Sequence, residues 1–104
     1  MRKENIINKL KEIRYKYEQE GVAILGIFGS YATNKANKDS DIDILIETTP
    51  KFLKRYKGFR SFSRLDEIKK ELKHYFDKEI DFIDKAGLKQ HNNTYILEHT
   101  LYVS

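Results

Sequence analysis

Three short apolar segments constrain what this chain can fold into. Residues 22–28 (VAILGIF) form a continuous apolar run, whereas residues 41–47 (DIDILIE) place an isoleucine at every second position and residues 79–84 (EIDFID) interleave apolar and acidic side chains. Alternation is typical of a half-buried β-strand, and a continuous run of this length suits a strand that is covered on both faces. The sequence therefore predicts a small sheet with helices packed against it.

The segments at the two ends of the chain have the spacing of amphipathic helices. Residues 4–19 place apolar side chains at three- and four-residue steps, and Gly21 is positioned to end that helix. Near the other end, Leu88, Tyr95 and Ile96 are expected to share the apolar face of a last helical segment.

The middle of the chain has no clear helix or strand periodicity at first. Residues 51–62 interleave basic and aromatic side chains, a pattern that suits a partner surface, single-stranded RNA or ordinary core, and Gly58 is expected to interrupt any helix there. Ser63 and Asp66 resemble a helix start, and an apolar stripe then continues to Phe76. The resulting order of helices and strands predicts an α/β or α+β fold, in which a small mixed β-sheet has flanking helices.

Size and composition exclude several classes of protein. We expect the 104 residues to form one domain, 1–104, and the absence of cysteine rules out disulfides and thiolate metal sites. No stretch approaches the roughly 20 apolar residues that a membrane span needs, so a cytoplasmic protein with no membrane partner is expected. The net charge of +4 could favour nucleic acid, but lysines alternate with glutamates as on solvated helices, so nucleic-acid binding is not expected.

Two aspartates, Asp41 and Asp43, stand one residue apart at the start of an apolar strand. At that spacing their side chains point to the same face, with about 7 Å between the two backbone positions. Two carboxylates at ~4 Å repel each other by roughly 4 kcal/mol at an effective dielectric near 20. A divalent cation would remove this repulsion, and hard oxygen ligands favour Mg²⁺. From this pair alone, a solvated loop or a capped turn explains the pattern equally well.

A third carboxylate favours the metal-site interpretation. Asp81 interrupts an apolar strand between Ile80 and Phe82, and a neighbouring strand could bring it beside Asp41 and Asp43. Three aspartates from two strands can hold two metal ions that fix a triphosphate. The other candidates lie at element ends, where solvated carboxylates are common: Asp39, Asp77, Glu79 and Asp84.

A Gly-Ser turn follows the first strand. Gly29 permits close backbone approach, and Ser30 could offer its hydroxyl and its N–H to a phosphate at the start of a short helix. A lone Gly-Ser pair is more often an ordinary helix cap. Its value here comes from standing behind a core strand and shortly before Asp41.

Taken together, these residues resemble the nucleotidyltransferase superfamily related to DNA polymerase beta. More narrowly, the chain is similar to the minimal nucleotidyltransferase (MNT) group, whose motif is G-S-x-A-x-G, a short loop and S-D-x-D. Asp81 falls where the third carboxylate of the family stands. The matching motif residues are Gly29, Ser30, Ala32, Ser40, Asp41 and Asp43.

The resemblance implies a nucleotidyltransferase fold and a Mg²⁺-dependent enzyme with ATP as substrate. Asp41 and Asp43 would bind two Mg²⁺ ions, and Asp81 would ligate one of them and assist deprotonation of the acceptor hydroxyl. The nucleotide-binding residues would be Gly29, Ser30 and Ser40.

The resemblance also implies a partner. Many members pair with HEPN-type ribonuclease toxins, and some neutralise the toxin by transferring AMP from ATP to one of its tyrosines. This chain would then be a protein adenylyltransferase antitoxin; the alternatives are a binding antitoxin that masks its toxin sterically, or transfer to a small molecule, which normally needs an additional acceptor-binding domain. We expect an oligomer or hetero-oligomer, because so small a domain needs another chain to complete its acceptor site.

One departure from the family pattern stands out. The family usually has Arg-Gly after the alanine, where this chain has Thr33 and Asn34. Asparagine tolerates the left-handed backbone that glycine would adopt, so the turn can survive. The missing arginine charge could come from Lys35 or Lys38.

Overall fold

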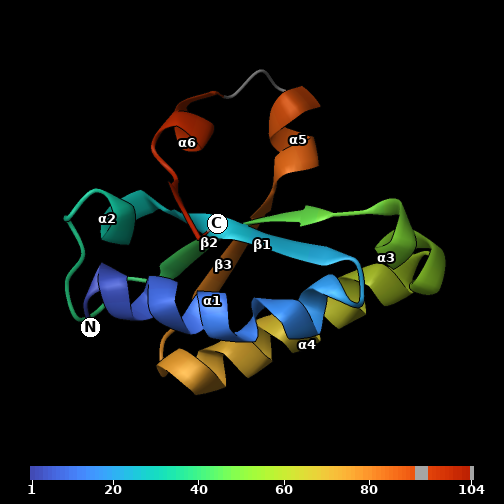
Figure 1. Ribbon diagram of the computed structural model, residues 1–104, viewed down its shortest axis with the longest axis horizontal. Coiled ribbons are helices and arrows are strands. Elements are labelled where there is room, and N and C mark those ends of the chain that lie inside the picture. The colour runs from blue at the N-terminus through green and yellow to red at the C-terminus, as the bar shows by residue number, and fades with distance from the viewer. Residues whose placement is uncertain (91–93, 104) are drawn as a thin grey trace.

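The computed structural model describes residues 1–90 and 94–103 (Figure 1). Their elements are α1 (Lys3–Glu18), β1 (Val22–Phe28), α2 (Gly29–Ala32), β2 (Ile42–Thr48), α3 (Pro50–Arg55), α4 (Phe59–Phe76), β3 (Ile80–Asp84), α5 (Lys85–Gln90), α6 (Thr94–Glu98) and β4 (Leu101–Tyr102). Within these residues, no helix is long and apolar enough to cross a membrane.

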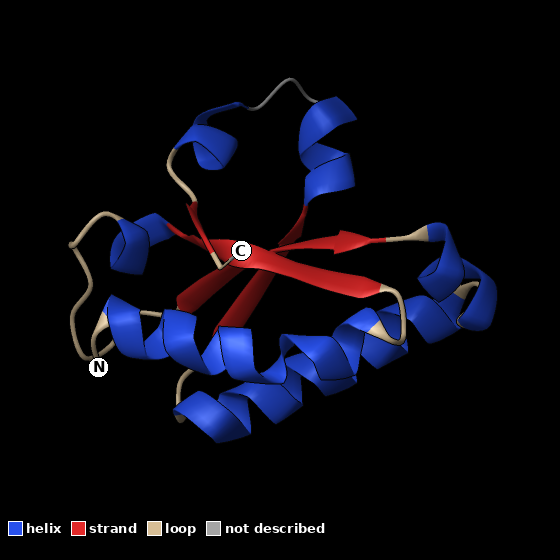
Figure 2. Cartoon of the chain, in the orientation of Figure 1, coloured by secondary structure: helices blue, strands red, loops and turns tan. Residues whose placement is uncertain are grey.

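The four strands form one mixed sheet in the order β3-β2-β1-β4 (Figure 2). β1 pairs antiparallel with β2 and with β4, whereas β2 pairs parallel with β3. Asp43 in β2 is in register with Phe28 at the end of β1 and with Asp81 in β3. The expected mixed sheet is therefore confirmed, and its register brings the end of one strand beside the starts of two others.

The larger core lies between one face of the sheet and helices α1 and α4. In Figure 1 these two helices run below the sheet, and α5 and α6 stand above it. Isoleucines at alternate positions of β2 enter this core, where they meet apolar side chains of both helices. Its fully buried members include Ile6, Leu10, Tyr17, Ile42, Ile44, Ile46, Ile68 and Leu72.

A smaller core covers the opposite face of the sheet. Phe28, Leu45 and Leu88 are buried there, and Ile96 and Leu97 of α6 pack against them. Because Phe28 and Leu45 alternate with residues of the larger core, the sheet is covered on both faces, as the continuous apolar run of residues 22–28 predicts.

An ion-pair network fastens the turn that follows α1 to α4. Arg64 donates two hydrogen bonds to the Glu20 carboxylate, at 2.7 and 2.6 Å, and one to Glu71 at 3.1 Å. The Glu20 and Arg64 side chains are only 13% and 15% exposed. Hydrogen bonding to Arg64 lowers the pKa of Glu20 to about 2. The bidentate geometry makes this pair stronger than an ordinary surface ion pair.

Two sequence expectations about helices are wrong. Helix α4 begins at Phe59 rather than at Ser63, because Gly58 adopts φ +61° and starts the helix directly after the break. At the other end, Tyr95 is 65% exposed and does not share the buried face of Leu88. That region forms two short helices and a fourth strand, because Leu101 and Tyr102 pair with β1.

Candidate active site

Asp43 lies near the start of β2, at the end of the sheet where β1 ends and β3 begins. Ile42 and Ile44 enter the larger core, so Asp43 between them points to the opposite face. Its side chain is half-buried, whereas Asp81 on the neighbouring strand is exposed. Parallel pairing places Asp43 and Asp81 at the same level, so their side chains project from the same face of the sheet.

The charges of these residues interact. Burial, followed by the negative charges of Asp81 and Asp41, raises the pKa of Asp43 above its ordinary value. Asp41 is exposed and precedes β2 by one residue. Asp41, Asp43 and Asp81 are therefore close enough for the charges of Asp41 and Asp81 to repel the charge of Asp43.

The backbone of Gly29 closes this site on the β1 side. Gly29 has φ +71°, and a Cβ atom at this position would lie 2.1 Å from Oδ2 of Asp43. No side chain fits in that space, and residues other than glycine rarely adopt this backbone conformation. The Gly-Ser turn is thus fitted directly against the central carboxylate.

The turn after α2 keeps its shape without the Arg-Gly pair of the family motif. Asn34 adopts the left-handed conformation at φ +63°. The Thr33 hydroxyl donates to the carbonyl of Gly29 at 3.0 Å, and the N–H of Lys35 donates to the carbonyl of Ser30 at 2.8 Å. The expectation that asparagine can replace glycine here is confirmed.

The loop before β2 is closed by its own polar groups. The N–H of Asn37 donates to the Ser40 hydroxyl oxygen at 2.9 Å, and the N–H of Ser40 donates to the carbonyl of Asn37 at 3.1 Å. Lys78 reaches across from the end of α4 and donates to the carbonyl of Lys38 at 2.7 Å. Ser40 therefore shapes the loop that leads into Asp41, and its role in nucleotide binding stays a prediction.

Other acidic residues near the sheet are engaged elsewhere. Asp84 accepts hydrogen bonds from the Thr48 hydroxyl and from the N–H of Ala86, and Glu79 pairs with Lys73. Asp77 ends α4 in the left-handed conformation. These contacts explain their places at element ends without a metal.

The donor set at Asp41, Asp43 and Asp81 suits a hard divalent cation, because it consists of carboxylates whose charges repel one another. Over residues 1–90 and 94–103, however, no three acidic or histidine side chains already stand in a ready metal-binding arrangement. The assignment of these three aspartates as metal ligands therefore stays a prediction.

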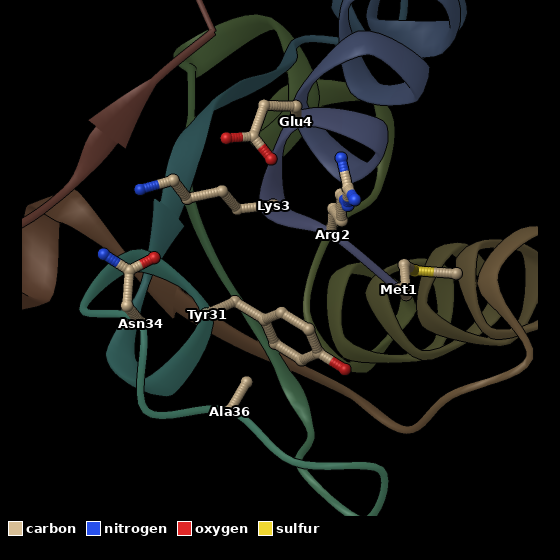
Figure 3. A pocket seen from close by; sticks show the side chains of 7 residues that line it. All are labelled: Met1, Arg2, Lys3, Glu4, Tyr31, Asn34 and Ala36. Carbon is tan, nitrogen blue, oxygen red and sulfur yellow. The ribbon is translucent and has the colours of Figure 1, made fainter.

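A cavity beside α2 is lined by residues that the sequence did not predict to belong to a site. Figure 3 shows this cavity, of about 240 Å³, lined by Arg2 and Lys3 at the start of α1 and by Tyr31 and Asn34 around α2. No local sequence pattern marks these residues, because α1 must first fold back onto β1 to bring its N-terminal end beside the Gly-Ser turn that follows β1. Arg2 and Lys3 add two positive charges beside that turn, and Glu4 adds one negative charge.

Three curated relatives span most of the chain. Protein adenylyltransferase MntA of Thermococcus cleftensis is 29% identical over 89% of this chain and 83% of that protein. Two proteins of Methanocaldococcus jannaschii, named "Putative protein adenylyltransferase MJ0126" and "Putative protein adenylyltransferase MJ0128", are 33% and 35% identical over 90% and 88% of this chain, and over 82% and 81% of their own lengths.

The fold has a solved counterpart as well. A structure titled "Structure of putative minimal nucleotidyltransferase" superposes with a TM-score of 0.70 over 97% of this chain and 95% of that chain, at 21% identity. The family described as "Nucleotidyltransferase domain" matches residues 4–103. The chain therefore belongs to the nucleotidyltransferase domain family and is a nucleotidyltransferase enzyme.

Proposed function

We propose that this enzyme is an antitoxin that transfers AMP from ATP to a tyrosine hydroxyl of a HEPN-type ribonuclease toxin, in a Mg²⁺-dependent reaction. The observation that carries the proposal is the convergence of Asp43 with Asp41 and Asp81 against the Gly29 backbone. The names of the three relatives, each a protein adenylyltransferase, support a protein acceptor and ATP as the donor.

In the proposed reaction, the acceptor oxygen attacks the α-phosphorus of ATP and a new P–O bond forms. The bond from the α-phosphorus to the bridging oxygen breaks, and pyrophosphate leaves. Asp81, exposed at the edge of the site, takes the proton of the acceptor hydroxyl. Gly29 lets the triphosphate approach the backbone, and Ser30 supplies polar groups at the same turn. Most of the rate enhancement comes from positioning and from charge stabilisation.

Magnesium would be held by Asp41, Asp43 and Asp81, and would neutralise the triphosphate charge. Arg2 and Lys3 contribute further positive charge from the cavity beside α2. These residues offer a replacement for the arginine that the motif lacks, in addition to Lys35 and Lys38. A second chain, either the toxin or another copy, would complete the acceptor side of so small a site.

A second candidate is an antitoxin that binds its toxin and masks it sterically, without transfer. The observation that favours it is the Thr33–Asn34 turn, which keeps the loop shape but lacks the guanidinium of the family motif. Under this alternative the carboxylates would be dispensable for neutralisation.

Labelling separates the two candidates. The chain would be incubated with ATP labelled at the α-phosphate, Mg²⁺ and the HEPN protein encoded beside it, and the label on each protein would be counted. We expect label on the partner with the wild-type chain and none with Asp43→Asn. The matched control is Asp39→Asn, because Asp39 is exposed in the loop two residues before Asp41 and its side chain makes none of the described contacts of the site.

Equal labelling by Asp43→Asn, or no labelling by the wild-type chain, would refute the transfer reaction. Growth of cells that express the toxin then decides the alternative. Relief of toxicity that survives Asp41→Ala/Asp43→Ala would select steric masking.

A further inference from the structure

The outer edge of β3 carries backbone groups without a partner strand. β3 is the end strand of the sheet and pairs with β2 alone. The carbonyl of Glu79 accepts the N–H of Ile42 at 2.9 Å, so residue 79 faces β2. Alternation along the strand then turns the N–H and C=O groups of Ile80 and Phe82 outward. In the described parts of the chain, no hydrogen bond is recorded to these outward groups.

An apolar groove lies beside this edge. It has a volume of about 210 Å³ and is formed by Phe62 and Leu65 of α4 and Phe82 of β3, with Asp66 and Lys69 at its polar rim. The Phe62 side chain is 72% exposed, although its neighbours Leu65 and Phe82 pack against the larger core. The exposed ring of Phe62 is therefore free to contact a partner that enters the groove.

The groove and the carboxylates meet on adjacent residues of β3. Asp81 projects from the face that carries Asp43, and Phe82 projects from the face that α4 covers. A strand added to β3 would place the side chain opposite Asp81 about 4.5–5.5 Å from it, on the same face. The side chains on either side of that residue would point toward the groove.

Only a polypeptide matches both features. A polypeptide backbone offers N–H and C=O groups at the spacing of the β3 edge, which neither a lipid surface nor a nucleic acid provides. Residues 51–60, which lead toward the groove along α3 and the start of α4, contain five basic and no acidic residues. This charge favours a segment with acidic residues beside its apolar ones.

We propose that an extended segment of the acceptor protein adds to the outer edge of β3, with its hydroxyl residue opposite Asp81 and apolar neighbours in the groove of Phe62, Leu65 and Phe82. This inference rests on the proposed transfer to a protein hydroxyl and specifies how the acceptor is presented. It predicts a local acceptor pattern of apolar, hydroxyl and apolar residues in succession.

The test uses a synthetic peptide with an Ile-Tyr-Ile centre and acidic ends, without ATP or Mg²⁺, so that binding is measured apart from transfer. Nuclear magnetic resonance spectra of the ¹⁵N-labelled chain would follow the amides of Ile80 and Phe82. We expect these amides to shift and Phe62→Ser to weaken binding about tenfold, because the aromatic contact with the apolar residues of the peptide is lost. The matched control is Phe59→Ser, which removes an 88% exposed phenylalanine of the same helix that does not line the groove.

Backbone methylation tests strand addition itself. Two further peptides carry N-methyl groups on alternate residues, and we expect one of them to lose binding and the other to keep it, because only alternate N–H groups of an added strand face β3. Equal behaviour of the two peptides, or equal weakening by Phe59→Ser and Phe62→Ser, would overturn the inference. Shifts at Phe82 caused by anionic phosphatidylglycerol vesicles or oligouridine, with none caused by the peptide, would overturn it as well.

Failure of this inference is distinguishable from failure of the proposed function. If the HEPN partner is labelled equally by wild type and Phe62→Ser, transfer stands and edge docking falls. If the peptide binds the β3 edge but no partner is labelled, docking stands and transfer falls.

Discussion

Gly29→Ala places a methyl group where the Asp43 carboxylate now lies. The new Cβ would be 2.1 Å from Oδ2 and 3.0 Å from the carboxyl carbon of Asp43. It would also force an L-residue to adopt φ +71°. We expect the substitution to destabilise the fold and to displace the carboxylate that forms the centre of the site.

The two costs can be estimated separately. Alanine in the left-handed region costs roughly 1–2 kcal/mol. Overpacking against a half-buried side chain adds about 1–3 kcal/mol. Gly58→Ala measures the cost of a positive φ without a clash, because Gly58 has φ +61° and ψ −133° and a Cβ there would meet no atom within 4 Å. We therefore expect a loss of about 1–2 kcal/mol for Gly58→Ala and about 2–5 kcal/mol for Gly29→Ala.

Urea unfolding of both variants, followed by circular dichroism, measures these losses. Gly29→Ala/Asp43→Ala provides the decisive comparison, because without the carboxylate the closest remaining contact is the Asp43 Cβ at 3.4 Å. The double variant should recover the clash cost, so that the two substitutions are non-additive by at least about 1 kcal/mol. Equal losses for Gly29→Ala and Gly58→Ala, or strict additivity in the double variant, would refute the close fit between the turn and the carboxylate.

Three further predictions concern the core network, the sheet and the charged site. Hydrogen bonding to Arg64 lowers the pKa of Glu20 from 4.5 to about 2, so its stabilisation is complete above pH 4.5 and is lost as the pH falls toward 2. The free energy of unfolding of Glu20→Gln should be lower than that of the wild type by on the order of 2 kcal/mol at neutral pH. It should also fall less steeply as the pH is lowered toward 2, and an unchanged dependence on pH would contradict the prediction. Gly26→Ala should lower the free energy of unfolding by about 2–3 kcal/mol, because its Cβ would lie 2.2 Å from the Leu101 carbonyl oxygen. The amides of β4 should then exchange faster with solvent, and unchanged protection of these amides would contradict the prediction. Asp43→Asn should raise the free energy of unfolding at pH 7 without metal by less than about 1 kcal/mol, because burial and the charges of Asp81 and Asp41 raise the pKa of Asp43; a lower melting temperature would contradict this.

Local sequence patterns predicted the central strands, because a strand that is buried on both faces needs apolar side chains at nearly every position. The run of residues 22–28 is β1 itself, and alternation over residues 41–47 assigned Asp43 and Ile44 to opposite faces of β2 correctly. The start of α4 was not predictable in the same way. Ser63 resembles a cap, but Gly58 already provides the backbone break, so the helix begins as soon as that break allows.

Asp81 lies beside Asp43 because β3 pairs with β2. A local sequence pattern can indicate that both segments are strands, but it does not determine which strands pair. The fit of Gly29 against Asp43 required the register of β1 against β2. The cavity with Arg2 and Lys3 depended on how α1 folds back onto β1. Long-range pairing therefore determined the features of the site that sequence patterns alone did not contain.

We propose that Asp41, Asp43 and Asp81 form the binding site for Mg²⁺ and the nucleotide. Isothermal titration calorimetry with an ATP analogue that carries a methylene bridge between the α- and β-phosphates tests it without turnover. We predict Mg²⁺-dependent binding by the wild-type chain and by Asp39→Asn, and at least about tenfold weaker binding, or about 1.4 kcal/mol, by Asp43→Asn. Equal affinity of wild type and Asp43→Asn for the analogue, or binding that does not depend on Mg²⁺, would contradict the claim.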